Sequence, residues 1–251
     1  MLKFKNYYYK YLGIYKSQSK KIILTKNRSI VINNLYQYPL IITKLNNNLL
    51  ISISPKHKKY LLHSNFILSK NINLIFLYKI LKKGLKEVNS SIDLMRIYTF
   101  ENIEYIFDMN LVNTLNLKEK EKEKYFTIFK NKNFNKIILE KLWNRNIKNV
   151  LEKRFFYIEK NNEIVSYSYI SDINFNGGNI IVYTKPKWRN MGFGKKVAQA
   201  SVKWCIDNNI LPIYRVSEKN NISIHIAKKI GLSYKKNEIV FKLKIISKLR
   251  E

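Results

Sequence analysis

The sequence predicts a two-part α/β (α+β) protein, with an N-terminal α+β accessory region over residues 1–95 and a larger domain over residues 96–251. Two observations predict this class. The first third of the chain carries short runs of β-branched and apolar residues between turn signals. From residue 154 onward, strand patterns alternate with segments whose apolar residues recur at helical spacing.

The N-terminal region is expected to contain short strands that end at turn signals such as Asn33-Asn34 and Pro55. Residues 74–88 then carry apolar residues at helical spacing and predict a helix, which Asn89 interrupts. We place the boundary between the two parts near this point. The expected strands cover residues 21–25, 28–33, 39–43 and 49–54.

Residues 101–150 are predicted to be helical. The alternating Lys and Glu of residues 118–124 are interpreted as solvated helix surface, because residues four apart carry the same sign. Residues 134–143 are expected to form a short amphipathic helix. One helical face is expected to carry Ile103, Ile106, Phe107, Asn110 and Leu111.

The last hundred residues give the sharpest pattern. Turns are expected at Asn161-Asn162 and at Gly177-Gly178, and Gly231 is expected to end the last helix. The predicted strands cover residues 154–160, 164–173, 179–184, 211–216 and 239–245. The predicted helices cover residues 193–208 and 220–230. Their inward faces are expected to carry Phe193, Val197, Ala198, Ser201, Trp204 and Cys205 in the first, and Ile222, Ile226, Ala227 and Ile230 in the second.

The net charge of +30, from 47 Lys and Arg against 17 Asp and Glu, predicts attraction to anions. Nucleic acid, anionic lipid and polyphosphate cofactors are all candidates. A second explanation is compositional, since Lys, Asn, Ile and Tyr are the residues that an A- and T-rich genome favours. The charge by itself therefore does not decide the function.

Cysteine and histidine usage argues against two kinds of site. Cys205 is the single cysteine, which excludes an intramolecular disulfide and a cysteine zinc cluster, and we expect it to be a buried core thiol. The three histidines lack the spacing of a metal pair, so no metal site is expected. Neither a signal peptide nor a membrane-spanning apolar run is recognised, so the expected location is the cytoplasm.

Residues 189–195, Arg-Asn-Met-Gly-Phe-Gly-Lys, lie between a predicted strand and a predicted helix. A helix N-terminus leaves its first amides unpaired and carries partial positive charge. Gly192 and Gly194 would allow close approach of an anion, and Arg189, Lys195 and Lys196 would add charge at the rim. A glycine turn that only packs the strand against the helix is the alternative. Neither a Walker loop nor a dinucleotide fingerprint is present.

The order of elements, together with R-x-x-G-x-G at residues 189–194, resembles the GNAT (GCN5-related) N-acetyltransferase superfamily. The likeness covers roughly residues 154–243, and residues 164–166, 183–184, 188–189, 204–205 and Pro212 resemble a bacterial subfamily with an additional N-terminal region. A second block matches the superfamily's downstream helix at Asn220, Ser223, Ala227, Lys229, Gly231 and Leu232.

The resemblance implies a mixed, mostly antiparallel sheet flanked by helices, and acetyl-CoA as co-substrate. Amides of residues 191–195 would hold the pyrophosphate, the edge of residues 182–184 would pair with the pantetheine arm, and Asn220 would bind near that arm. The expected cofactor-binding residues are Val182, Tyr183, Thr184, Arg189, Asn190, Met191, Gly192, Phe193, Gly194, Lys195 and Asn220.

Two departures leave the catalytic residues unassigned. Many family members have a tyrosine seven residues after the motif asparagine, where this chain has Ala227. The subfamily often places a carboxylate on the strand that leads to the threonine, but residues 179–183 contain none. Candidates for proton transfer are Tyr183, Glu218 and Tyr234, besides Glu163 and Asp172.

The resemblance implies acetyl transfer from acetyl-CoA to a primary amine of a small molecule or peptide by direct attack, in a monomer or homodimer. The alternative is a nucleic-acid-associated or coenzyme-binding module with weak or lost catalysis. The aromatic and basic residues 4–11 could stack on bases, could lie on a membrane surface, or could form a solvated segment with packed tyrosines.

Overall fold

The computed structural model describes residues 4–15, 21–32, 36–61, 73–84, 90–100 and 107–244. The chain divides into two compact units. The first is built from Met1–Tyr98, Arg215–Asn221 and Tyr234–Glu251, and the second from Thr99–Tyr214 and Ile222–Ser233. The chain therefore returns to the first unit twice after leaving it. The predicted division at residues 95 and 96 stays a prediction.

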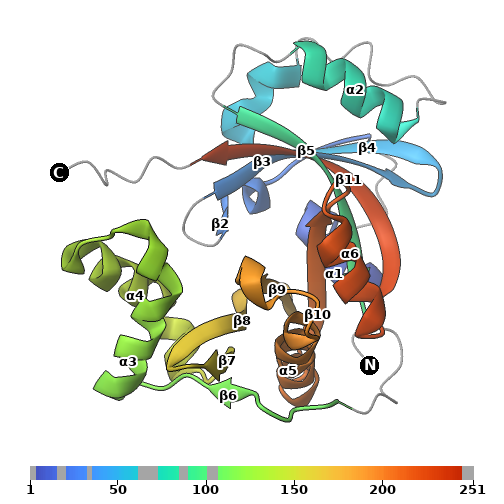
Figure 1. Ribbon diagram of the computed structural model, residues 1–251. Coiled ribbons are helices and arrows are strands. Elements are labelled where there is room, and N and C mark those ends of the chain that lie inside the picture. Colours follow the sequence, from blue (N-terminus) through green and yellow to red (C-terminus); the bar gives the residue numbers. More distant parts are fainter. Residues whose placement is uncertain are drawn as a thin grey trace. The chain divides into compact units, whose positions relative to one another are not determined.

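The first unit is a mixed sheet with a helix on each face (Figure 1). Its elements are α1 (Phe4–Leu12), β1 (Ile22–Leu24), η1 (Lys26–Ser29), β2 (Val31–Ile32), β3 (Tyr36–Leu45), β4 (Asn48–Ile53), η2 (Pro55–Leu61), α2 (Leu74–Gly84), β5 (Ser90–Thr99), the last residues of β10 (Leu211–Ser217) and β11 (Ser233–Lys244). The strand order is β1-β4-β3-β11-β5-β10, with β2 beside β3. β1 runs parallel to β4, whereas β3 runs antiparallel to β4 and to β11.

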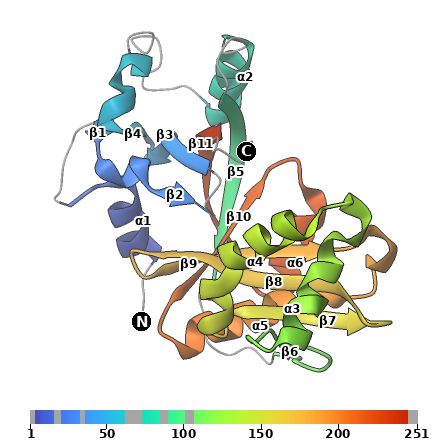
Figure 2. The ribbon, with the colours of Figure 1, turned by 90° about the vertical axis from the view of Figure 1, so that its left-hand side faces the viewer.

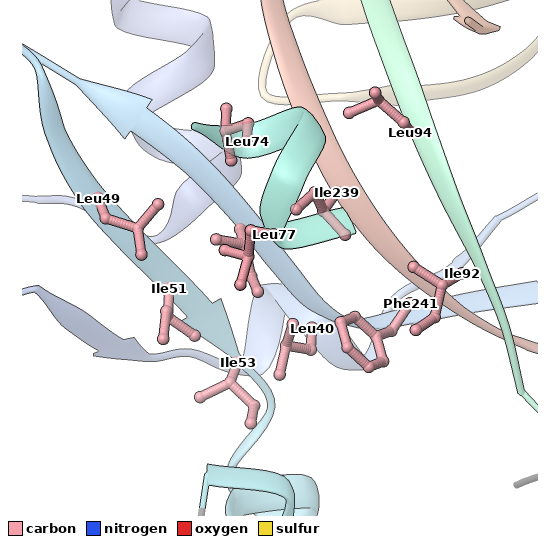
Figure 3. Close-up of a cluster of buried hydrophobic side chains, with 11 residues drawn as sticks. Leu40, Leu49, Ile51, Ile53, Leu74, Leu77, Ile92, Leu94, Ile239 and Phe241 are labelled. Carbon is pink, nitrogen blue, oxygen red and sulfur yellow. The ribbon is translucent and has the colours of Figure 1, made fainter. Parts of the chain in front are cut away.

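Strands β3 and β4 are apolar on both faces because each face carries a helix. Leu74 and Leu77 of α2 pack with Leu40 of β3 and Ile51 of β4 on one face (Figure 3). On the other face, the hydroxyl of Tyr8 in α1 donates a hydrogen bond to Thr43 Oγ1 over 3.0 Å. Since successive strand residues point to opposite faces, these strands read as nearly continuous apolar runs.

Helix α1 decides among the interpretations of the N-terminal tyrosines. Tyr7, Tyr8 and Tyr11 are buried, and guanidinium groups of Arg28 and Arg215 lie 4.0 and 4.2 Å from the centre of the Tyr11 ring. These rings are packed in the first unit and are not presented to bases or to a membrane surface. The packed-tyrosine interpretation is the one that the structure supports.

The second unit is a mostly antiparallel sheet between two helical layers. Its elements are β6 (Asn113–Thr114), α3 (Glu119–Phe126), η3 (Thr127–Lys132), α4 (Lys136–Leu151), β7 (Phe155–Lys160), β8 (Glu163–Asn174), β9 (Gly177–Thr184), η4 (Pro186–Trp188), α5 (Phe193–Asp207), the first residues of β10 and α6 (Asn221–Lys229). The strand order is β10-β9-β8-β7-β6, in which only β9 and β10 are parallel. Figure 2 shows α3 and α4 in front of β7 and β8, with α5 behind them.

Alternation along β7 distributes side chains between the two layers of helices. Phe155 and Tyr157 pack with Tyr125 and Trp143 on the α3 and α4 side, whereas Ile158 packs with α5. The expected mixed, mostly antiparallel sheet flanked by helices is confirmed.

Several local predictions are confirmed in the second unit. Asn161 and Asn162 form the expected turn with φ of 51° and 58°. Gly231 ends α6 with φ of 80°, and Leu232 N–H donates to the Ala227 carbonyl over 3.0 Å. Cys205 is fully buried, as expected.

Two turn and helix predictions near the site are wrong. The chain reverses at Phe175 and Asn176, with φ of 56° and 62°, so Gly177 and Gly178 belong to β9. A Cβ at Gly178 would lie 2.8 Å from Ile170 Cγ2, so this glycine serves close packing. In α6, Ile222 is 58% exposed and does not face inward.

The middle of the chain departs most from expectation. Of the helical face expected at residues 103–111, residues 103–106 lie outside the described residues, and residues 107–111 form no helix. The Lys and Glu run is helical from Glu119, but it is not merely solvated. Lys122 Nζ lies 2.9 Å from Glu140, and Lys124 Nζ lies 2.7 Å from Glu159.

Several element bounds also differ from expectation. The strand β5 was missed, although Ile92 and Leu94 alternate with polar neighbours. The strand expected at residues 28–33 is divided between η1 and β2, and the helix expected at residues 134–143 extends to Leu151. Helix α2 ends at Gly84 among the described residues, and β11 begins at Ser233.

Candidate functional site: a backbone cradle at the start of α5

The motif at residues 189–195 occupies the turn between β9 and α5, as predicted. The short helix η4 leads from the strand into this turn. Asn190 and Gly192 adopt left-handed conformations, with φ of 64° and 76°. The side chains from Arg189 to Gly192 are exposed. Residues 189–192 thus form an open surface turn, and residues 193–195 begin α5.

A run of backbone amides in this turn lacks acceptors. The Arg189 amide still donates to the Pro186 carbonyl, and the first hydrogen bond of α5 runs from the Lys196 amide to the Gly192 carbonyl over 3.1 Å. Among the described residues, the amides of residues 190–195 donate no hydrogen bond, and no side chain caps the helix. These donors lie at the positive end of the α5 dipole, which is the arrangement that binds anionic groups.

The two motif glycines serve different needs. Gly192 has open space around a would-be Cβ, but its positive φ disfavours other residues. Gly194 lies against β9, where a Cβ would be 3.0 Å from Thr184 Oγ1. Thr184 Oγ1 in turn lies 2.8 Å from Ser166 Oγ, a partly buried contact that was not predicted from the sequence. The alternation of Ser166 and Ser168 in β8 was the available signal for small polar residues beneath α5.

The edge of β9 beside this turn is open. The pairing of β9 with β10 covers only residues 177–179 of β9, and in the described part of the second unit no strand pairs with that edge at residues 180–184. Lys185 N–H donates to the Val165 carbonyl, so the antiparallel alternation turns the backbone groups of Val182 and Thr184 away from β8. Arg189 Nε accordingly reaches the Thr184 carbonyl at 3.4 Å.

The charges around the turn are partly compensated. Lys195 is exposed at the rim, as expected. Lys196 is held by Asp108, with Nζ 2.7 Å from the carboxylate. The hydrogen bond from Lys196, followed by that from the Asn110 amide, holds the pKa of Asp108 below its ordinary value. Asp108 was missed because its segment was expected to be helical, and no motif marks it.

Of the three candidates named first, which are Tyr183, Glu218 and Tyr234, Tyr183 lies in β9 beside the turn. It is 39% exposed and contacts Tyr167 with ring centres 5.4 Å apart. Its side chain points to the sheet face opposite α5, because Thr184 and Val182 face α5. Tyr183 therefore offers a hydroxyl group on the α3 and α4 side of the open edge.

The other two candidates belong to the first unit. Glu218 forms an ion pair with Arg96 over 2.7 Å, and this hydrogen bond raises the pKa of Arg96. Tyr234 is exposed and contacts the Tyr98 ring edge-on, while partial burial raises its pKa. Asn220, expected near the pantetheine arm, is also in this unit, directly before α6.

Two further groups of the second unit, Glu163 and Cys205, are unsuited to act as a base and as a nucleophile. Hydrogen bonds from Lys130 and then Lys185 lower the pKa of Glu163, which weakens it as a base. Burial raises the pKa of Cys205 to about 12 and keeps the thiol protonated. Among the described residues, no three His, Cys, Asp or Glu side chains gather as a metal site would need. No helix in that part of the chain is long and apolar enough to cross a membrane.

Comparison with known proteins identifies the same family. A family model described as GNAT acetyltransferase matches residues 77–241. An uncharacterized N-acetyltransferase of Bacillus subtilis (strain 168), YdfB, is 29% identical over 99 residues, which is 39% of this chain. The match spans 38% of the length of that relative.

A solved structure supports the fold. An acetyltransferase from the GNAT family of Colwellia psychrerythraea matches with a TM-score of 0.51 at 11% identity, covering 78% of each chain. At this level of identity the likeness concerns the fold alone. The family model matches well over half of the residues of this chain. The chain therefore belongs to the GNAT acetyltransferase family.

Proposed function

We propose that this protein is an N-acetyltransferase that moves an acetyl group from acetyl-CoA to a primary amine of a small molecule or peptide. The observation that carries the proposal is the run of backbone amides at residues 190–195, at the N-terminus of α5, which find no acceptor in the part of the chain that the structure describes. Such a run matches the oxygens of a diphosphate. Family membership supplies the reaction class.

The second unit offers donors and acceptors for the rest of the cofactor. Arg189 and Lys195 would add positive charge beside the diphosphate. The outward backbone groups of Val182 and Thr184 would pair with the amides of the pantetheine arm, as an added strand would. When bound, acetyl-CoA supplies a thioester whose carbonyl carbon accepts the amine. We propose the cytoplasm as the place of action, since a single buried thiol suits a reducing compartment.

Tyr183 is proposed as the acid that protonates the departing thiolate. Tyr183 lies in the same unit as the turn, and its side chain is partly exposed beside the open edge of β9. Direct attack requires a neutral amine, so the acceptor must lose its proton to solvent or to a group beside the open edge. Glu163 is unsuited to this because two lysines favour its charged form.

The alternative is a coenzyme-binding protein with weak or lost catalysis. It is favoured by Ala227, which is fully buried where many family members carry the acid tyrosine. Tight binding of acetyl-CoA, with no acetylation across a panel of amines and peptides, would identify this alternative.

Calorimetric titration with acetyl-CoA tests the proposal. Gly192→Asp would place a carboxylate beside the amides. At about 5 Å and an effective dielectric constant of about 20, repulsion from one phosphate charge costs about 3 kcal/mol, which weakens binding roughly a hundred-fold. Gly192→Asn is the matched neutral control, because Asn already adopts a positive φ at Asn190. It should bind within a few-fold of the wild type.

Two results would end the proposal. One is a folded wild-type protein that does not bind acetyl-CoA. The other is equal binding by the wild type and the Asp variant. Circular dichroism of each variant distinguishes loss of the binding site at residues 190–195 from loss of the fold.

A further inference from the structure

Helix α2 is apolar on the side that faces the sheet and also on the side that faces solvent. Leu74 and Leu77 point into the core of the first unit (Figure 3), and Tyr78 and Leu81 pack partly against the same cluster. These four residues fill the inner face of the helix. An ordinary surface helix would carry polar residues on the rest of its circumference.

The outer face of α2 instead carries large apolar side chains. Phe76 is 59% exposed, Ile75 41% and Ile80 37%. Residues four apart lie above one another on a helix, so Phe76 and Ile80 form one stripe and Ile75 and Lys79 form the next. Lys79 is exposed beside the apolar side chains. We call Ile75, Phe76, Lys79 and Ile80 the outer face of α2.

The region of the chain that contains this face is strongly basic. Residues 1–98 contain 18 Lys and Arg but only two acidic residues, Glu87 and Asp93. An apolar stripe beside Lys79, in a part of the chain that is this basic, matches a surface that is negative outside and apolar beneath.

We propose that the outer face of α2 docks on the surface of an anionic lipid bilayer. Phe76, Ile75 and Ile80 would enter the boundary between headgroups and acyl chains, and Lys79 would meet the phosphates. At 11 residues, α2 is too short to span a bilayer and would lie in its plane. Its inner face stays on the sheet, so docking requires no unfolding of the first unit.

Charge and chemistry favour a bilayer over the other occupants. A second copy would bring another net charge of +30 against a face that already carries Lys79. Nucleic acid would need hydrogen-bond donors for its phosphates, whereas three of the four outer-face side chains have none. Acyl chains are the partner for which all three apolar side chains are suited.

Co-sedimentation with lipid vesicles tests the proposal on the full chain. We expect binding to vesicles of equal parts phosphatidylglycerol and phosphatidylcholine, and much weaker binding to phosphatidylcholine alone. The double variant Phe76→Ser/Ile80→Ser should lower the partition coefficient at least roughly ten-fold. Lys79→Gln should lower it about five-fold at low salt and less at high salt.

Ile137→Ser is the matched control, because Ile137 of α4 is 66% exposed in the other unit. This change should leave vesicle binding unaltered. In a second measurement, lipids with brominated acyl chains should quench the tryptophan fluorescence that Phe76→Trp adds. They should not quench the fluorescence that Ile137→Trp adds. Thermal melting checks that each variant keeps its fold.

The proposal fails if the folded protein ignores anionic vesicles, or if the double variant binds them as well as the wild type. It also fails if the double variant changes the molar mass in solution or lowers binding to duplex RNA while vesicle binding persists. These results would assign the outer face to a second copy or to nucleic acid. Acetyl-CoA binding is read separately, so either proposal can fail alone.

Discussion

Replacing Gly194 by Ala tests the close approach of the α5 N-terminus to β9. The added Cβ would lie 3.0 Å from Thr184 Oγ1 and 3.1 Å from Ile226 Cδ1. Ile226 Cδ1 is the end of a flexible side chain and can move. Thr184 Oγ1 is less free, because it lies 2.8 Å from Ser166 Oγ, and Ser166 is fully buried.

The sign of the effect depends on which of two contributions is larger. Ala in place of Gly favours a helix by about 1 kcal/mol. The contact is about 0.5 Å shorter than an ordinary van der Waals contact, and overpacking of this kind costs about 1–3 kcal/mol. We therefore expect Gly194→Ala to destabilise the protein by about 1 kcal/mol.

A double-mutant cycle with Thr184→Ala isolates the contact. Thr184→Ala removes the obstructing oxygen, and Ser166 Oγ keeps the Tyr183 carbonyl at 3.2 Å as an acceptor. In that background, Gly194→Ala should be neutral or stabilising. Urea denaturation of the four proteins should give a coupling free energy of about 1–2 kcal/mol.

The reasoning would be refuted if Gly194→Ala alone stabilised the protein. A coupling free energy below about 0.3 kcal/mol would refute it equally, because the two sites would then be independent. Equal slopes in the four denaturation curves confirm that the cycle compares native states.

Three further predictions concern the second unit. Cys205 should react with a thiol reagent only as the protein unfolds, because burial raises the pKa of its thiol to about 12. The rate of labelling should therefore not rise between neutral pH and pH 9. Rapid labelling of the native protein would contradict this prediction. Glu163→Gln should cost up to about 0.5 kcal/mol at pH 7, an exposed ion-pair contribution. Lys130 and Lys185 hold the pKa of Glu163 in the folded protein below its unfolded value of about 4.3. The loss of stability should therefore fade as the pH falls below about 4.3 and through the folded pKa. A loss of stability that grows on acidification would contradict this prediction. Asn162→Gly should stabilise the protein by about 0.5 kcal/mol, because Asn162 has a φ of 58°; a lower melting temperature would show that the Asn side chain matters more.

The sequence predictions that proved correct were those in which the local residue preference agrees with what the tertiary structure requires at that position. The turn at Asn161 and Asn162 requires positive φ, which Asn tolerates, so the sequence is enough to place it. The Gly177-Gly178 pair misled because two unrelated needs select glycine. Here the need was close packing beneath α5, and the neighbouring Phe175 and Asn176 made the turn. Pattern alone cannot separate these two reasons.

The lysine and glutamate run shows a similar limit. Residues four apart in the run carry like charges, which predicts little stabilisation of the helix by charge pairs within the run. Lys122 and Lys124 each pair with a glutamate three residues earlier, Glu119 and Glu121, and more closely with Glu140 and Glu159, which lie on other elements. Charge pairing across elements depends on packing that local spacing does not encode.

The sequence by itself determined the family, the position of the turn before α5 and the need for glycine at Gly192, because backbone amides and φ preferences are properties of a short segment. Tertiary structure alone decided that the edge of β9 is open, that Asp108 neutralises Lys196, and that Glu218 and Tyr234 belong to a different unit from the turn. These features arise when segments far apart in the chain are brought together or kept apart. No spacing within a single segment records that outcome.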